Sequence, residues 1–76
     1  MADPATCGED YEINITIEDI DDLVVKFEGE TIITPAPTHV SGNTWKIKVL
    51  GTQIPTAGQL QYFDGATLLE SVTVNC

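Results

Sequence analysis

The sequence predicts one small all-β domain, a two-layer sandwich of about six short antiparallel strands. Two segments alternate strictly between apolar and polar residues, and two further strand-like segments flank an Asp-Gly dipeptide that favours a tight hairpin turn. Stretches with proline or glycine separate the strand-like segments at short intervals. The 76 residues leave room for one domain, and a domain of this size buries only about 60% of its unfolded surface, so its stability is marginal.

The first alternating segment covers residues 11–17. A period of two places its apolar residues on one face of a strand and its polar residues on the other. We expect the apolar set to face the core: Tyr11, Ile13, Ile15 and Ile17. The residues between them, Glu12, Asn14 and Thr16, are expected to face water.

Residues 18–34 predict an acidic turn followed by a hairpin. Residues 23–27 and 31–34 are rich in β-branched residues, and Gly29 lies in the expected turn between them. The alternative is a helix over residues 17–27, since the apolar residues there also fit a helical period and Gly29 would end it. The β-branched pair Val24-Val25 favours the strand.

The second alternating segment covers residues 44–50 and follows a Ser-Gly-Asn turn. Its apolar residues Trp45, Ile47 and Val49 are expected in the core, with Lys46 and Lys48 together on the opposite face. Upstream, residues 35–37 have the sequence Pro-Ala-Pro. Proline lacks the backbone donor that a central strand needs, so this stretch predicts a crossing at a sheet edge.

The last segments, residues 59–63 and 66–74, predict a hairpin around Asp64-Gly65. We expect Leu68, Val72 and Val74 to point into the core. Glu70 has the same parity as these residues, which indicates a bulge or a sheet edge there.

The formal net charge of −9 limits the classes of partner. With three lysines and no arginine, the chain would be repelled by nucleic-acid phosphates and by anionic membranes, so neither is an expected partner. A basic protein surface is the expected electrostatic partner, while the simpler interpretation is that the charge keeps a small β-domain soluble.

The densest charge comprises four residues, which we take as interaction candidates: Glu18, Asp19, Asp21 and Asp22. Several carboxylates suit Ca²⁺, but the calcium-loop pattern and its glycine are missing. We therefore interpret the four as a solvated acidic turn that can dock on a basic partner, and expect no metal.

Cys7 and Cys76 are the only cysteines and lie near the two ends of the chain. Three states are open: a bridge within one chain, a bridge between copies, and two free thiols. A bridge within the chain would stabilise the domain by about 4 kcal/mol on the chain-entropy model. The pair fits no zinc pattern, because further Cys or His ligands are missing.

No motif points to catalysis. His39 is the only histidine and lies in an expected loop after the proline segment. We interpret it as a surface residue because no activated nucleophile accompanies it. Phosphate-binding glycine loops, serine elbows and zinc-protease pairs are absent from the sequence. We expect a chain without enzyme activity and without a cofactor.

Residues 1–6 are expected to form a flexible N-terminal arm, and residues 7–76 a single sandwich domain. No stretch of the sequence has the basic start and apolar run of a signal peptide, and none is apolar enough to span a membrane. We expect the chain in a virion, or alternatively in the cytoplasm of a host cell.

Two stretches, residues 40–50 and 58–74, resemble small Ig-like sandwich modules of tailed-phage structural proteins. The resemblance implies a virion accessory protein, such as a decoration, collar or tail component, that stabilises or bridges an assembly. Its partners would be other structural proteins, through homo-oligomer or lattice contacts. The alternative function is an acidic inhibitor or charge mimic that blocks a basic site on another protein.

Overall fold

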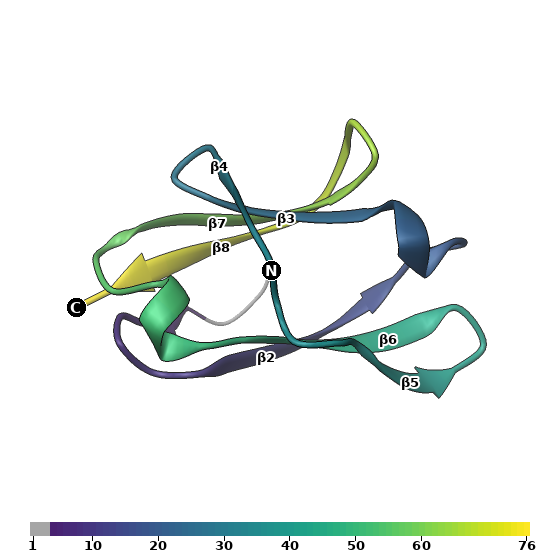
Figure 1. Ribbon diagram of the computed structural model, residues 1–76, viewed down its shortest axis with the longest axis horizontal. Coiled ribbons are helices and arrows are strands. Elements are labelled where there is room, and N and C mark those ends of the chain that lie inside the picture. Colours follow the sequence, from purple (N-terminus) through teal and green to yellow (C-terminus); the bar gives the residue numbers. More distant parts are fainter. Residues whose placement is uncertain (1–3) are drawn as a thin grey trace.

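Two β-sheets face each other in the computed structural model, which describes residues 4–76 (Figure 1). The five-stranded sheet has the order β1 (Ala5–Thr6), β8 (Thr67–Asn75), β7 (Gly58–Asp64), β3 (Leu23–Phe27) and β4 (Glu30–Ile32). The three-stranded sheet has the order β2 (Tyr11–Thr16), β6 (Thr44–Val49) and β5 (Thr38–Ser41). Two single 3₁₀ turns complete the elements, η1 (Ile20–Asp22) and η2 (Gly51–Gln53).

This strand order is that of an immunoglobulin-like sandwich. In the usual lettering β2, β6 and β5 take the places of strands B, E and D, and β8, β7, β3 and β4 those of G, F, C and C′. The predicted all-β sandwich is confirmed. The described residues hold two strands beyond the expected set, β1 and β5. Neither shows a period of two in the sequence, because β1 has two residues and a bulge at Val40 interrupts β5.

The alternating segments behave as their period predicts. β2 and β6 pair antiparallel in one unbroken register, so Ile13 lies opposite Ile47 and Ile15 opposite Trp45. The intervening polar residues all lie exposed on the outer face of this sheet. Both lysines of β6 are among them.

The segment after the acidic turn is a strand, and the helical alternative is wrong. β3 and β4 form an antiparallel hairpin in which Val25 lies opposite Ile32. The two turn residues, Glu28 and Gly29, have φ angles of 53° and 81°, the left-handed pair that a type I′ hairpin requires. Helical structure in residues 17–27 is limited to the single turn η1.

The last hairpin contains the expected bulge, and the position of this bulge shows that the expected face of Leu68 is wrong. Tyr62 of β7 lies opposite Glu70 of β8, but the next residue, Phe63, lies opposite Leu68. Leu69 is therefore the extra residue of the bulge. Val72 and Val74 point into the core, as expected. Leu68 does not, and its side chain is 48% exposed, because the extra residue reverses the alternation before it.

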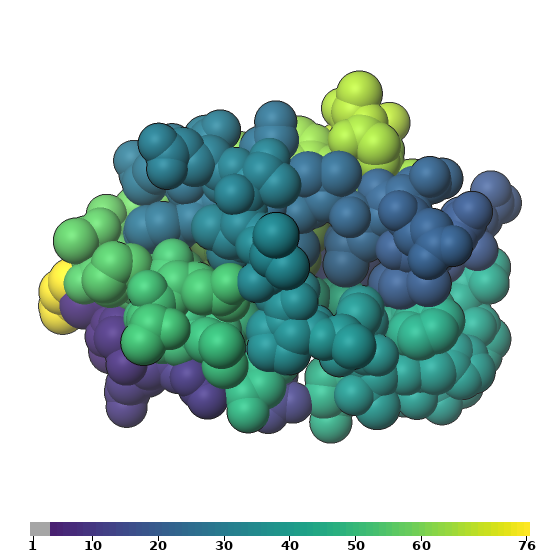
Figure 2. Space-filling model, viewed as in Figure 1, coloured from purple at the N-terminus to yellow at the C-terminus, as the bar shows by residue number. Residues whose placement is uncertain are grey.

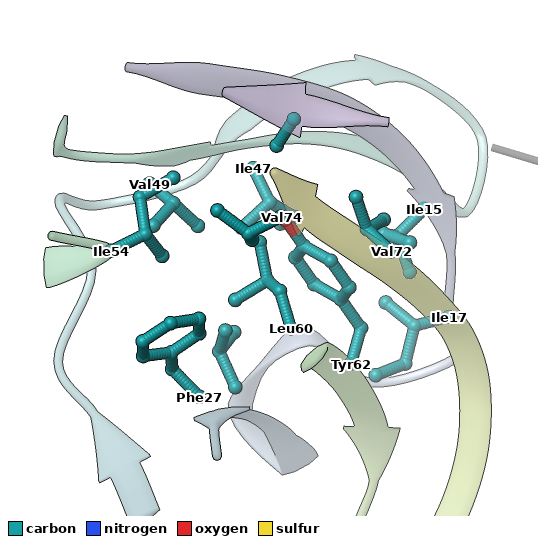
Figure 3. Packing of buried hydrophobic residues seen from close by; sticks show 12 residues of the cluster. Ile15, Ile17, Phe27, Ile47, Val49, Ile54, Leu60, Tyr62, Val72 and Val74 are labelled. Carbon is teal, nitrogen blue, oxygen red and sulfur yellow. The ribbon is translucent and has the colours of Figure 1, made fainter. Parts of the chain in front are cut away.

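Both sheets contribute to one core, in which Leu60, Tyr62 and Val72 meet residues of the opposite sheet (Figure 3). Besides Leu68, nine residues were expected in the core, and six of them are buried: Ile15, Ile17, Ile47, Val49, Val72 and Val74. The other three, Tyr11, Ile13 and Trp45, are half-buried and pack against the margin of the core. The reason is their position, since β2 is an edge strand and Trp45 borders the edge strand β5. The core also contains residues outside the expected set: Ala5, Val25, Phe27, Ile54, Leu60 and Tyr62.

The start of the domain lies earlier than expected. Ala5 and Thr6 form β1, which pairs parallel to β8, and Ala5 is buried. The small Ala5 side chain fits beside Val74, so this part of the expected arm belongs to the sandwich. Residues 1–3 of that arm lie outside the described residues.

Residues 33–37 cross from the five-stranded to the three-stranded sheet, and we call them the crossing segment (Figure 1). The edge crossing predicted from Pro35 and Pro37 is therefore confirmed. Cys7 and Cys76 lie at disulfide-bonding distance, with their Cα atoms 5.0 Å apart. Of the three states left open for the cysteines, the structure contains the bridge within one chain.

Candidate interaction surfaces

The four acidic candidates lie together on the exposed turn between β2 and β3. Asp19 caps η1, because its Oδ1 accepts a hydrogen bond of 3.0 Å from the Asp21 backbone N–H. The turn is tied to the β7–β8 hairpin by a bond of 2.9 Å from the Gly65 N–H to the Asp22 carbonyl. Its carboxylates are therefore presented to solvent on an ordered backbone.

The lysines are engaged elsewhere. Lys46 lies 4.0 Å from Glu12 and Lys48 lies 3.5 Å from Asp10, both pairs joining β6 to β2 or to the residue just before it. Lys26 lies 5.3 Å from the centre of the Phe63 ring. No ion pair of residues 4–76 involves the acidic turn, so its negative charge is not neutralised locally.

Asp10 anchors the start of β2. Its Oδ1 accepts a 2.8 Å hydrogen bond from the Gly51 N–H, which lowers the pKa of the carboxyl below its ordinary value. Partial desolvation opposes the shift, while Lys48 lowers the pKa further. The Gly8 N–H also donates to the Ile54 carbonyl at 2.9 Å, so the turn before β2 is held against η2.

His39 lies exposed on β5 rather than in the expected loop. Its ring is 4.9 Å from the Trp45 ring in an edge-to-face arrangement, and its Nε2 lies 2.9 Å from the Gly42 carbonyl. Because a carbonyl only accepts, Nε2 is the donor in this bond. His39 therefore closes the β5–β6 turn and covers the half-buried tryptophan.

An apolar groove of about 300 Å³ lies between β3, η1 and the crossing segment, on the face shown in Figure 2. Its lining includes Ile20, Leu23, Ile32 and Pro37. Ile33, at the start of the crossing segment, borders it with 89% of its surface exposed. We did not expect this groove from the sequence. One signal for it was present, since successive strand residues point to opposite faces, so one of the adjacent residues Ile32 and Ile33 must face outward.

The free edge of β2 is the longest regular edge of the sandwich. β2 pairs with β6 along one side, and among residues 4–76 no other strand pairs with it. The Ile17 N–H donates to the Asn43 carbonyl at 2.8 Å, on the side of β6. Backbone groups alternate along a strand, so those of Glu12, Asn14 and Thr16 point away from β6.

One buried polar group has no role in these surfaces. The Tyr62 hydroxyl lies inside the core, and no residue of the described chain hydrogen-bonds it. Burial raises the pKa of this phenol well above its usual range, and nearby Tyr11 and Glu70 raise it further. The group therefore stays neutral at every physiological pH.

Comparison with protein-family models, with curated proteins and with solved structures finds no match to this chain. Within the described residues no helix has the length and apolar character needed to cross a bilayer. The same residues contain no group of three or more His, Cys, Asp or Glu side chains placed to hold a metal ion.

Proposed function

We propose that this chain is a non-catalytic interaction module of a larger assembly, with a virion accessory component (decoration, collar or tail) as its specific setting. The observation that carries the proposal is the regular, unpaired edge of β2 on an otherwise well-tied sandwich. Exposed strand edges are templates for pairing with another chain, and natural proteins usually protect them. The disulfide supports the same role, since bridges persist outside reducing compartments.

The test of this proposal uses virus particles purified from the biological source of the chain. Purified particles are analysed by quantitative mass spectrometry beside the soluble fraction. We expect the chain at a fixed copy number per particle, retained through gradient sedimentation. A chain that is abundant in the soluble fraction as a monomer and absent from the particles would overturn the proposal.

A second candidate function is an acidic inhibitor that blocks a basic site on another protein. The acidic turn favours it, because no lysine among the described residues neutralises Glu18, Asp21 or Asp22. The test uses the triple variant Asp19→Asn, Asp21→Asn and Asp22→Asn, in which asparagine retains the capping ability of residue 19. We expect inhibition of the target to weaken with added salt and in this variant, and salt-independent inhibition would count against the idea.

A further inference from the structure

Within residues 4–76, three of the four sheet edges are very short, lead into prolines or are broken by a bulge, and the fourth has none of these features. β1 is two residues long and runs directly into the bridged Cys7. β4 is three residues long and leads into the crossing segment with its two prolines, while β5 is interrupted by a bulge at Val40. β2 has six residues in unbroken register and contains no proline, glycine or lysine.

The unpaired groups of β2 form a regular template. Glu12, Asn14 and Thr16 point their N–H and C=O groups away from β6, and no backbone hydrogen bond within residues 4–76 satisfies them. These groups recur at the spacing that an added strand needs. Ile13 is half-buried at the same edge, so an apolar residue on the added strand would extend the core over it.

The carboxylates on either side of β2 determine which kind of strand can pair with it. The template is flanked by Glu9 and Asp10 on one side and by Glu18 and Asp19 on the other, all four of them exposed. Of these four, Asp10 is paired with Lys48 at 3.5 Å, and no ion pair within residues 4–76 involves the other three. In a symmetric antiparallel pair of two copies centred on Asn14, Asp10 would lie opposite Glu18 at both ends. Like charges directly opposite each other destabilise a strand pair, so a second copy is disfavoured.

We infer that β2 accepts, as an added strand, an extended segment of another protein that has apolar residues at alternate positions and basic residues at both ends. The backbone template supplies the hydrogen bonds, and the flanking carboxylates supply the selectivity for positive charge. This inference rests on the proposed role as an interaction module and names the contact and the partner chemistry.

The first experiment is residue-resolved amide hydrogen exchange with a probe peptide. The probe is acetylated and amidated Lys-Lys-Val-Thr-Val-Thr-Val-Lys-Lys, and the control peptide has glutamates in place of the lysines. In the free protein the amides of Glu12, Asn14 and Thr16 should exchange fast while those of Ile13 and Ile15 are protected. Saturating probe should slow the three fast amides by about tenfold or more, and the control peptide should not.

Three results would overturn the inference. The first is no added protection along β2 at saturating probe, and the second is protection along β5 or around the groove instead. The third is protection of the same three amides without peptide that grows with protein concentration, together with a dimer in sedimentation, since that would make a second copy the partner.

The second experiment compares two variants at one position. Asn14→Pro removes an outward N–H and leaves in place the N–H groups that pair with β6, while Asn14→Ala keeps the outward N–H as the matched control. Affinity for the probe should fall about tenfold or more in the proline variant and stay unchanged in the alanine variant. Circular dichroism checks folding of both, and the exchange experiment decides alone if the proline variant does not fold.

The same two variants separate this inference from the proposed function. If the proline variant loses the probe peptide and also leaves the particles, both stand. If it loses the peptide but remains on the particles at full copy number, β2 is not the assembly contact. The inference then fails while the assembly role remains.

Discussion

At Gly51 the backbone of η2 passes so close to the turn before β2 that no side chain can be placed there. A Cβ atom at this position would collide with the Gly8 carbonyl and lie 2.8 Å from the Glu9 nitrogen. The same N–H of Gly51 is the donor that holds Asp10. A single glycine therefore permits the backbone contact on which the geometry of the β2 entry depends.

Replacing this glycine should be costly. We expect Gly51→Ala to lower the free energy of unfolding by about 1–3 kcal/mol, because the neighbouring backbone must shift to admit a methyl group. Chemical denaturation measures the effect, and Thr52→Ala, an exposed neighbour in the same turn, is the matched control. Equal stability of the two variants would show that the turn before β2 adapts freely.

Asp10 should give the domain an acid-sensitive component of stability. Its folded-state pKa lies below the ordinary value of 3.8, so its contribution is present above that value and is lost as the pH falls through the folded-state pKa. We expect Asp10→Ala to lower the melting temperature at neutral pH and to reduce its fall on acidification. Asp10→Asn, which keeps an acceptor for the Gly51 N–H, should lie between the two, and identical pH profiles for all three would contradict the assignment.

At the scale of elements, the β3–β4 hairpin is held by its turn as well as by its strands. The Glu28 N–H donates to the Gln59 carbonyl at 3.0 Å, and the Glu28 carboxylate accepts from the Gln59 N–H. Gly58 leaves the space in which this carboxylate lies. The turn thus docks on β7 through Gln59 and Gly58.

The left-handed conformation of Gly29 can be tested directly. No atom lies near a Cβ built on Gly29, so Gly29→Ala tests the backbone alone. With φ at 81°, we expect this variant to lose about 1–2 kcal/mol of stability. Gly29→Asn should lose less, since asparagine tolerates this region, and thermal unfolding of both variants decides.

Elements could be predicted from the sequence where period or turn chemistry was strong. The alternation in residues 11–17 and 44–50 identified β2 and β6, and the Asp64-Gly65 turn identified the last hairpin, β7–β8. β5 was missed because its bulge at Val40 breaks the period, and β1 because two residues have none. Leu68 was assigned to the wrong face because the position of a one-residue bulge is decided by packing against β7.

Of the candidate surfaces, one could be predicted from local sequence and the other could not. The acidic turn could be located from the sequence, since composition alone places Glu18 and Asp22 in an exposed loop. The template on β2 could not, because an edge exists only relative to a strand order that is set by non-local pairing. Trp45 illustrates the same limit, since its half-burial follows from the neighbouring edge strand and not from its own segment.

For the whole molecule, the bridge between Cys7 and Cys76 spans a sequence separation of 69 residues. Closing so long a loop restricts the unfolded chain strongly, which matters for a domain with a small core. Breaking the bridge by reduction, or in the double variant Cys7→Ser and Cys76→Ser, should lower the free energy of unfolding by about 4 kcal/mol. Urea denaturation with and without reductant measures this loss.

The controls for the bridge follow from its connectivity. Reductant should slow the wild-type chain in electrophoresis without changing its mass beyond two hydrogens, and should leave the double serine variant unaffected. A disulfide-linked dimer in non-reducing electrophoresis would contradict a bridge within one chain.

The bridge also determines how the domain would respond to mechanical load. It joins Cys7 and Cys76 across a Cα distance of 5.0 Å, so a pull applied between Ala5 and Cys76 passes through a covalent bond and bypasses every strand except β1. A reduced chain would have to resist the same pull through the hydrogen bonds between β1 and β8. In its oxidised form the domain would therefore keep a fixed length under such a pull, and its folded surfaces would stay intact.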